Sequence, residues 1–413
     1  MDVKSFNSKA IDSNFEIVKI RDIIEKPPQY WANERAIDWN PNIDYRYIRI
    51  TDIDDYWNLK EDERKTAEKI ENKYIVNEND LLFARSWATA WKCYFVTKNI
   101  KWIFAWYMIR FVLNHKKCIS KYLFYITFTN FYKKRVEKIS RAAAQPNINS
   151  QEYLDFEFPL PPLEIQQEII DKIDSALAEK KNLENKSDEI LNSIDDYVLS
   201  ELWIQLPKKH EEKKYFTVNI EDIKNWRFDV TFCKHILQSK QIQWKYETVK
   251  IKDTVQEIKT WLPIRKDQRI SDWTIPYYWA NGIIWYMDDF THNGEYLVVS
   301  QDWYIWNHYV VSWKFWASNH NRVMKIKDWI NINYIKAILD ITNYDYLITW
   351  WVIPKLTKES LEAIEIPLPP KEIQDKIANE VKSRIEKANE LKKQANEIYE
   401  QAKNEVEKMI LKE

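Results

Sequence analysis

The residues of this sequence that are best suited to chemistry are positively charged and crowd one segment of the chain. Between Ala84 and Arg141 there are 13 Lys or Arg residues and a single acidic residue, Glu137, although the net charge of the 413-residue chain is −1. Tyr and Phe are interspersed among them. A basic surface with aromatic side chains, balanced by acidic residues elsewhere, is typical of contact with a polyanion. A basic face that is merely solvated is the alternative, but so lopsided a segment favours nucleic acid.

Several side chains in and beyond this segment have the chemistry to read DNA. Lys and Arg bind phosphates, whereas Arg recognises guanine and Asn or Gln recognise adenine through paired hydrogen bonds. The candidates in the first half of the chain are Arg85, Ser86, Thr89, Lys92, Arg110, Lys133, Lys134, Arg135, Arg141, Gln145 and Asn147. Those in the second half are Gln301, Asn307, His308, Asn319, His320, Asn321 and Arg322. A structural role, such as holding a loop or capping a helix, stays open for each of them.

No catalytic constellation accompanies these residues. The sequence has no Asn-Pro-Pro-Tyr-type motif for adenine methylation, no glycine-rich cofactor loop and no Gly-x-x-x-x-Gly-Lys phosphate-binding loop. The six His are scattered without metal-ligand spacing, and the three Cys form no CxxC pair. We therefore expect no catalytic site, no metal and no cofactor. A folded chain with a DNA-binding charge pattern and no catalytic apparatus is interpreted as a reader that recruits enzymes.

Length and composition predict two or more globular domains. A chain of 413 residues exceeds a single core, and contents of 45% hydrophobic and 15% aromatic residues suffice for packed interiors. No apolar run reaches the roughly 18 residues of a membrane span, and the N-terminus has no signal-peptide core. The odd number of Cys fits a reducing compartment, so a cytoplasmic location without membrane contact is expected.

The elements that must position the candidates occur twice. Pro-Leu-Pro-Pro-x-Glu-Ile-Gln stands at 159–166 and again at 367–374. The prolines keep the preceding backbone extended, and Glu164 and Glu372 then complement the dipole of a starting helix. Apolar residues follow at steps of three and four, which is the seam of a two-stranded coiled coil. The seam positions are Ile169, Ile173, Ala176, Leu183, Ile190, Ile194 and Tyr197 in one run, and Ile377, Val381, Ala388, Leu391, Ala395, Ile398, Ala402 and Met409 in the other.

The globular parts repeat as well. Residues 15–22 alternate as a short strand that leads into a helix start, and residues 246–253 repeat this pattern. Further strands are expected at 45–53, on both sides of a loop within 80–92, and across 274–286 and 296–312. Helices are expected at 131–141, which is basic, and across the acidic patch 52–78.

These patterns predict an α+β fold. We expect two similar globular domains separated by two long helices, which pack as an antiparallel coiled coil because neither can bury its seam alone. The expected limits are 1–158 for the first domain, 159–205 for the first long helix, 206–366 for the second domain and 367–413 for the second long helix.

The chain is unusually rich in tryptophan and poor in glycine. The chain has 21 Trp and two Gly, whereas average usage gives about 29 Gly. Some Trp follow Asp where Asp-Gly would form a tight turn with positive φ, as at Trp39 and Trp329, while Gly282 and Gly294 follow Asn as such turns require. We hypothesise that most of these Trp are glycines encoded by UGA, which the codons of the gene test directly. A Trp-rich surface that stacks on DNA is the alternative.

Taken together, these motifs resemble the specificity (S) subunit of a Type I restriction–modification system. The resemblance covers essentially the full length. It rests on the repeated Pro-Leu-Pro-Pro-x-Glu-Ile-Gln motif, on Arg85-Ser86-x-Ala88-Thr89 and on Gln145-Pro146-Asn147-Ile148-Asn149. It implies two target-recognition domains that each read half of a split double-stranded DNA site, at a spacing fixed by the two helices. The chain departs from the family at the Trp positions, where similar proteins usually have Gly.

The resemblance also implies protein partners. Modification subunits would carry S-adenosylmethionine and methylate adenine, and restriction subunits would hydrolyse ATP, translocate and cut, so S-adenosylmethionine, ATP and Mg²⁺ are expected on partners alone. The residues by themselves leave a second class of function open, a coiled-coil scaffold or adaptor that binds proteins rather than DNA. The first long run has 10 acidic and 4 basic residues between Glu164 and Asp196, which suits spacing and docking more than DNA contact.

Overall fold

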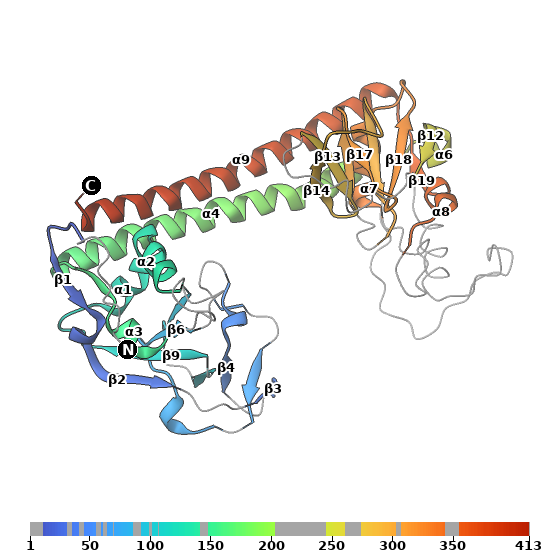
Figure 1. Cartoon of the computed structure of the whole chain (residues 1–413). Helices are drawn as coiled ribbons and strands as arrows, with labels where there is room; N and C mark the ends of the chain where they lie inside the picture. Colours follow the sequence, from blue (N-terminus) through green and yellow to red (C-terminus); the bar gives the residue numbers. More distant parts are fainter. Residues whose placement is uncertain are drawn as a thin grey trace. The chain divides into compact units, whose positions relative to one another are not determined.

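The chain folds into two compact units in the computed structural model (Figure 1). The structure describes residues 11–30, 35–40, 45–54, 59–60, 64–68, 70–85, 92–98, 101–105, 107–140, 148–202, 245–260, 274–302, 307–342 and 355–412. The first unit comprises Met1–Glu184 with Lys392–Glu413, and the second comprises Asn185–Leu391. Each unit combines β-sheets with short helices and part of each long helix, so the fold is α+β as predicted.

The first unit is built on a four-stranded antiparallel sheet in the order β2-β9-β6-β7. These strands are β2 (Ile24–Tyr30), β9 (Met108–Leu113), β6 (Leu81–Ala84) and β7 (Cys93–Phe95). Every residue of β6 is buried, as expected for an inner strand covered on both faces. Two smaller pairs join β3 (Ala36–Asp38) to β5 (Lys65–Ala67) and β4 (Arg46–Ile48) to β8 (Trp102–Phe104).

Among the described residues of this unit, short α-helices are formed by α1 (Ser120–Ile126), α2 (Asn130–Ser140) and α3 (Ser150–Leu154). Asn149 caps α3, because its side chain accepts hydrogen bonds from the N–H groups of Gln151 and Glu152. Tyr153 of α3 packs its ring against Phe83 and Phe111, with centroid distances of 4.9 and 6.1 Å. The helix is thereby fixed on one face of the sheet.

The second unit repeats this plan. Its four-stranded sheet has the order β12-β18-β15-β16, with β12 (Val255–Lys259), β18 (Asn321–Ile326), β15 (Tyr296–Ser300) and β16 (His308–Val311). A second sheet holds the hairpin β13 (Ile275–Trp279) and β14 (Gly282–Met287) beside β17 (Trp316–Ala317). The helices are α6 (Ile251–Thr254), α7 (Ile332–Ile341) and α8 (Lys358–Glu362).

Both long helices begin directly after their proline pairs, as α4 (Leu163–Glu201) and α9 (Lys371–Ile410). In the first unit, Lys180 of α4 donates to the side chain of Asn396 at 2.5 Å, and Lys172 binds Glu405. In the second unit, Ser187 donates to the carbonyl of Ala388 at 2.9 Å, and Glu201 binds Lys376 at 2.8 Å. Residues with higher numbers in α4 contact residues with lower numbers in α9. The two helices therefore run antiparallel within each unit (Figure 1).

The glutamine that ends the repeated motif anchors each long helix. Gln166 is fully buried; its Oε1 accepts from the N–H of Ile119 at 2.8 Å, and its Nε2 donates to the carbonyls of Pro161 at 2.8 Å and Lys117 at 3.2 Å. Gln374 does the same in the second unit, accepting from Asn331 at 2.9 Å and donating to Pro369 at 2.9 Å. We call this arrangement the glutamine clamp. It ties the helix start to the segment that leads into α1 or α7.

Two further contacts surround each clamp. Tyr122 of α1 and Tyr334 of α7 donate to the carbonyls of Pro159 and Pro367, each at 2.7 Å. Beside them, β1 (Glu16–Lys19) pairs antiparallel with β10 (Glu157–Leu160), and β11 (Thr248–Lys250) pairs in the same way with β19 (Glu365–Pro367). The predicted strands at 15–22 and 246–253 are therefore confirmed, and both units use them to hold the backbone in front of a long helix.

Two expectations differ from the structure. The patch 52–78 is not a helix in its described part, which contains the extended β5 and two 3-10 turns, η2 (Ile50–Asp52) and η3 (Asn72–Tyr74). The reason is pairing: Thr66 and Ala67 are buried where β5 meets β3, whereas an acidic helix there would have no apolar stripe to bury.

The second difference concerns the backbone at tryptophan. Gly282 and Gly294 have φ of 106° and 122°, as their turns require, but Asn79 alone among the described non-glycine residues has a positive φ. Trp39 and Trp329 therefore do not adopt the conformation that we expected of replaced glycines. The recoding hypothesis stays a prediction for the gene sequence to decide. Trp273 and Trp303 lie outside the described residues.

Candidate nucleic-acid interface

We call β6 and β15 the central strands of their four-stranded sheets. The residue directly after the central strand makes corresponding backbone hydrogen bonds in both units. Arg85 follows β6; its N–H donates to the carbonyl of Tyr107 and its carbonyl accepts from Ile148, both at 2.9 Å. Gln301 follows β15; its N–H donates to the carbonyl of His320 at 2.9 Å and its carbonyl accepts from Leu356 at 2.7 Å. Two of the predicted DNA-reading residues thus occupy equivalent places. Each is held between two backbone segments: the residue just before the neighbouring strand, β9 or β18, and the residue just before the cap of helix α3 or α8.

The side chain of Arg85 is half-buried and lies against an aromatic ring. Its guanidinium carbon is 4.9 Å from the ring centroid of Tyr30, the last residue of β2. The hydroxyl of Tyr30 accepts a hydrogen bond of 2.7 Å from the N–H of Ser150, the first residue of α3. The Nε of Arg85 is buried and has no hydrogen-bond partner in the part of the chain that the structure describes. Tyr30 is 37% exposed and was missed by sequence reasoning, because it lies 55 positions from Arg85.

Gln301 presents a different surface at the equivalent place. It is only 6% exposed, and its Nε2 donates to the carbonyl of Asn319. Neighbouring candidates are similarly engaged. Nδ1 of His320 lies 2.8 Å from Asp302, and the ring of His320 packs edge-on to Trp279 at 4.9 Å. In the second unit, the side chain that follows the central strand is therefore buried and hydrogen-bonded within the unit.

Two predicted phosphate or base contacts, Lys92 and Arg110, are buried. Nζ of Lys92 donates to the carbonyl of Ile53 at 3.2 Å, so this ammonium serves backbone acceptors in the interior. Arg110 forms a 2.6 Å ion pair with Asp80 and donates to the carbonyl of Ile75 at 3.1 Å. Burial raises the pKa of Asp80, although the nearby Arg110 charge acts in the opposite direction. Both cations have structural roles in this conformation.

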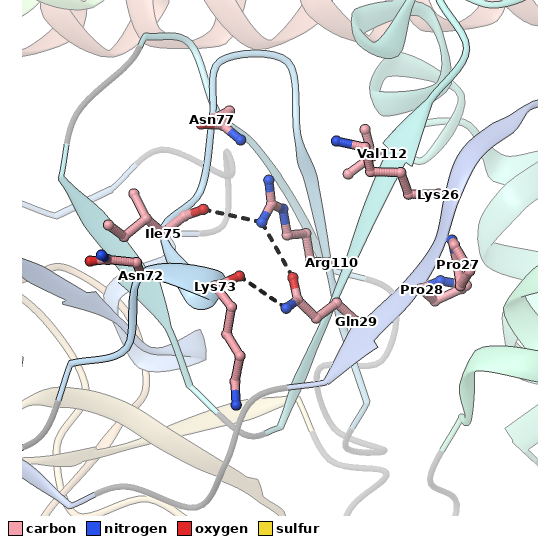
Figure 2. A pocket seen from close by; sticks show the side chains of 10 residues that line it. All are labelled: Lys26, Pro27, Pro28, Gln29, Asn72, Lys73, Ile75, Asn77, Arg110 and Val112. Carbon is pink, nitrogen blue, oxygen red and sulfur yellow. Dashed lines mark hydrogen bonds between the residues drawn. The ribbon is translucent and has the colours of Figure 1, made fainter.

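Arg110 also lines a cavity of about 610 Å³ (Figure 2). We call it the β2 groove; it is lined by Lys26, Pro27, Pro28, Gln29, Asn72, Lys73, Ile75, Asn77, Arg110 and Val112. The two prolines cannot donate to β9, and the strand register shifts between Lys26 and Gln29. The groove therefore opens where the pairing of β2 with β9 is interrupted.

The groove carries positive charge at its rim. Lys26 and Lys73 are exposed, and Figure 2 shows Gln29 bridging Arg110 and the carbonyl of Lys73, with hydrogen bonds of 3.3 and 2.9 Å. Lys73 also forms a 2.7 Å ion pair with Glu71. Sequence reasoning missed this groove because, apart from Arg110 and Val112, its lining residues come from segments outside the basic stretch 84–141.

The basic helix α2 was predicted correctly, and its three basic candidates differ in environment. Lys134 is exposed. Lys133 is half-buried, and its pKa is lowered by burial and by the charge of Lys403. Arg135 forms a 3.2 Å ion pair with Glu157 and lies over the ring of Phe131 at 5.5 Å. Burial lowers the pKa of Arg135 as well.

The remaining candidates of the second unit support the sheet. Asn307 donates to the carbonyl of Ala280 at 3.2 Å, and the buried Asn321 donates to the carbonyl of Tyr278 at 2.9 Å. His308 is buried with Nδ1 2.7 Å from Asp340. Arg322 is half-buried, which lowers its pKa. The candidates Ser86, Thr89, Arg141, Gln145 and Asn147 lie outside the described residues.

The described residues contain no group of three or more His, Cys, Asp or Glu side chains arranged to hold a metal ion. None of the described helices combines the length and the apolar character needed to cross a bilayer.

Comparison with known proteins identifies the family. A model described as the Type I restriction modification DNA specificity domain matches residues 12–193 and 243–401. The chain belongs to this family. The two matched specificity regions follow the internal repeat, since each contains one four-stranded sheet and one glutamine clamp.

Individual relatives agree with this assignment. The chain is 31% identical over 153 residues to a Haemophilus influenzae protein named as a type I restriction enzyme specificity subunit; the match spans 36% of this chain and 38% of that relative. A chain from a structure of a type I R-M system, studied for its complex assembly and conformational transition, is 14% identical with a TM-score of 0.55. That likeness covers 97% of this chain and 98% of the other, and it shows that the two chains share a fold.

Proposed function

We propose that the chain is the DNA-specificity subunit of a Type I restriction–modification complex and reads a bipartite double-stranded target without a catalytic site of its own. The observation that carries this proposal is the match of the specificity family to two regions of the chain, each with the same sheet order and the same anchored helix start. Two similar readers in one chain suit a target with two half-sites. The predicted target-recognition domains, 1–158 and 206–366, would each read one of them.

DNA affinity would come from exposed cations of the first unit. Lys26 and Lys73 at the β2 groove and Lys134 on α2 have long side chains suited to phosphate oxygens. Sequence choice requires groups that reach base edges, and residues after the central strands are suitably placed for this. The buried Lys92 and Arg110 would support these surfaces from within.

The long helices would set the spacing and receive partners. The antiparallel contacts of α4 and α9 fix one helix against the other in each unit, which suits a coiled-coil spacer between half-sites. Their outer faces would bind helices of the modification subunits, and restriction subunits would join that assembly. S-adenosylmethionine, ATP and Mg²⁺ would be bound by the partners, in the cytoplasm.

Co-expression with cognate Type I modification subunits tests the proposal. In a bacterial host without such a system, adenine methylation should appear at one bipartite motif, and only when this chain is present. The logarithm of the DNA-binding constant should fall linearly with the logarithm of the salt concentration. Absence of any DNA binding at low salt, with binding to other proteins retained, would instead support the scaffold function.

A further inference from the structure

Arg85 is held by its backbone on two sides and by one aromatic ring at its side chain, and it forms no ion pair among the described residues. Its backbone is fixed by hydrogen bonds to Tyr107 and Ile148, and its guanidinium lies over Tyr30 at 4.9 Å. Tyr30 is itself fixed, because its hydroxyl accepts from the N–H of Ser150 at the start of α3. Three segments of the first unit thus converge on this one residue.

This side chain has unused hydrogen-bonding capacity. A guanidinium has five N–H donors, and the Nε–H of Arg85 is buried without an acceptor among the described residues. A half-buried donor without a partner is unfavourable, and such groups point to a role that supplies the partner later. A flat cation stacked on an aromatic ring presents its terminal nitrogens as a fork of fixed direction.

We infer that Arg85 reads a guanine in the half-site of the first unit, with Tyr30 as the platform that fixes the plane of its guanidinium. This inference rests on the proposed function. Guanine presents two acceptors, O6 and N7, in the major groove, and a guanidinium fork matches them. Phosphate would also accept from the fork, but the exposed lysines of this unit suit phosphate without a preset direction.

The second unit shows what a closed version of this position looks like. Gln301 has corresponding backbone contacts, and its Nε2 is already used by the carbonyl of Asn319. Its Oε1 lacks a partner among the described residues, as Nε of Arg85 does, but the Gln301 side chain is buried whereas that of Arg85 is half-exposed. Of these two side chains, we therefore expect that of Arg85 to be open to a base. The difference predicts that one half-site, and not both, depends on the residue after the central strand.

The test uses the full chain in complex with its modification subunits. Arg85→Lys keeps the charge but removes the fork, and Arg85→Gln replaces it with a group that suits adenine. Tyr30→Ala removes the platform, whereas Tyr30→Phe keeps the ring. Lys134→Gln is the control for loss of a phosphate contact in the same unit: it should weaken binding to all sequences and leave the selected motif unchanged. Preferences are measured by selection from a randomised DNA library and by mapping methylated adenines in genomic DNA.

Arg85→Lys should reduce discrimination at one guanine of one half-site by about 10- to 100-fold, and leave the other half-site and the salt dependence unchanged. Tyr30→Ala should weaken the same preference, and Tyr30→Phe should retain most of it. Uniformly weaker binding to all sequences would overturn the inference and assign Arg85 to phosphate. An unchanged motif in both Arg85 variants would assign it a purely structural role.

The same measurements test the proposed function separately from the inference about Arg85. If the wild-type complex selects a motif and the Arg85 variants select the same one, the inference fails while the proposed function stands. If the wild-type complex selects no motif, both fail. Thermal unfolding of each variant complex shows that altered preference does not arise from loss of the fold, and Tyr30→Ala offers an independent route should an Arg85 variant not fold.

Discussion

The two units have the same internal frame but different surfaces. Gln166 and Gln374 make corresponding buried contacts, as do Tyr122 and Tyr334, and both central sheets have the same strand order. The residues that follow the central strands differ, since Arg85 is open and Gln301 is closed. The two units therefore share the contacts that anchor the starts of the long helices, whereas the residues that follow the central strands differ between them.

The largest expected effect comes from removing a glutamine clamp. Gln166→Leu leaves the N–H of Ile119 and the carbonyls of Pro161 and Lys117 without this partner, and Gln374→Leu leaves those of Asn331 and Pro369. Each substitution should lower the free energy of unfolding of its own unit by about 2–4 kcal/mol, because buried polar groups would lose their partners. Gln166→Leu should cost more, since that clamp has one further hydrogen bond.

Hydrogen exchange resolved along the chain measures this effect unit by unit. Faster exchange should be confined to the first unit for Gln166→Leu and to the second for Gln374→Leu. A loss of protection of equal size in both units after either substitution would show that the clamps do not act locally.

The sequence revealed the shared frame better than the differing surfaces. The repeated proline motif located both helix starts, since proline and the first-turn carboxylate act through local backbone physics. The strands around the loop within 80–92 and the basic helix α2 were also predicted correctly. Each of these depends on residues near one another in the chain.

What the sequence could not reveal depends on distant pairing. Tyr30 reaches Arg85 because β2 pairs with β9 and β9 with β6, and no local pattern predicts that order. Charge counting likewise cannot distinguish Lys92 and Arg110, which bind interior carbonyls, from exposed cations such as Lys134. The acidic patch 52–78 was misread because β5 gains its stability from β3 rather than from its own periodicity.

Acid should weaken the second unit through His292. This imidazole stacks on Phe315 at 4.9 Å, and burial lowers its pKa to about 4, with Lys259 acting in the same direction and Glu257 against it. Between pH 6.5 and 4 the unfolded chain binds a proton that the folded unit does not, so stability falls as the pH falls through this window. The contribution lost should be about 1–3 kcal/mol and is fully present above pH 6.5.

Urea unfolding of the wild type and of His292→Phe at pH 7 and pH 5 measures this contribution. The variant keeps a stacked ring but cannot bind the proton, so it should lose less stability on acidification than the wild type. His115→Gln is the control in the first unit, where the exposed His115 has no such stacking partner among the described residues. Equal acid sensitivity of the wild type and His292→Phe would contradict the prediction.

The smallest effects should come from the rim of the β2 groove, and they distinguish affinity from choice of sequence. Lys26→Gln and Lys73→Gln should each weaken DNA binding uniformly across sequences and reduce the slope of log K against log salt by about 1, because one phosphate contact releases about one counterion. Lys26→Gln should have the larger effect, since Lys73 already shares its charge with Glu71. Lys382→Gln, on an exposed face of α9, should change neither quantity. A change of the selected motif in the Lys26 or Lys73 variants would instead place base readout at the groove, and would move the open reading position of the first unit away from Arg85.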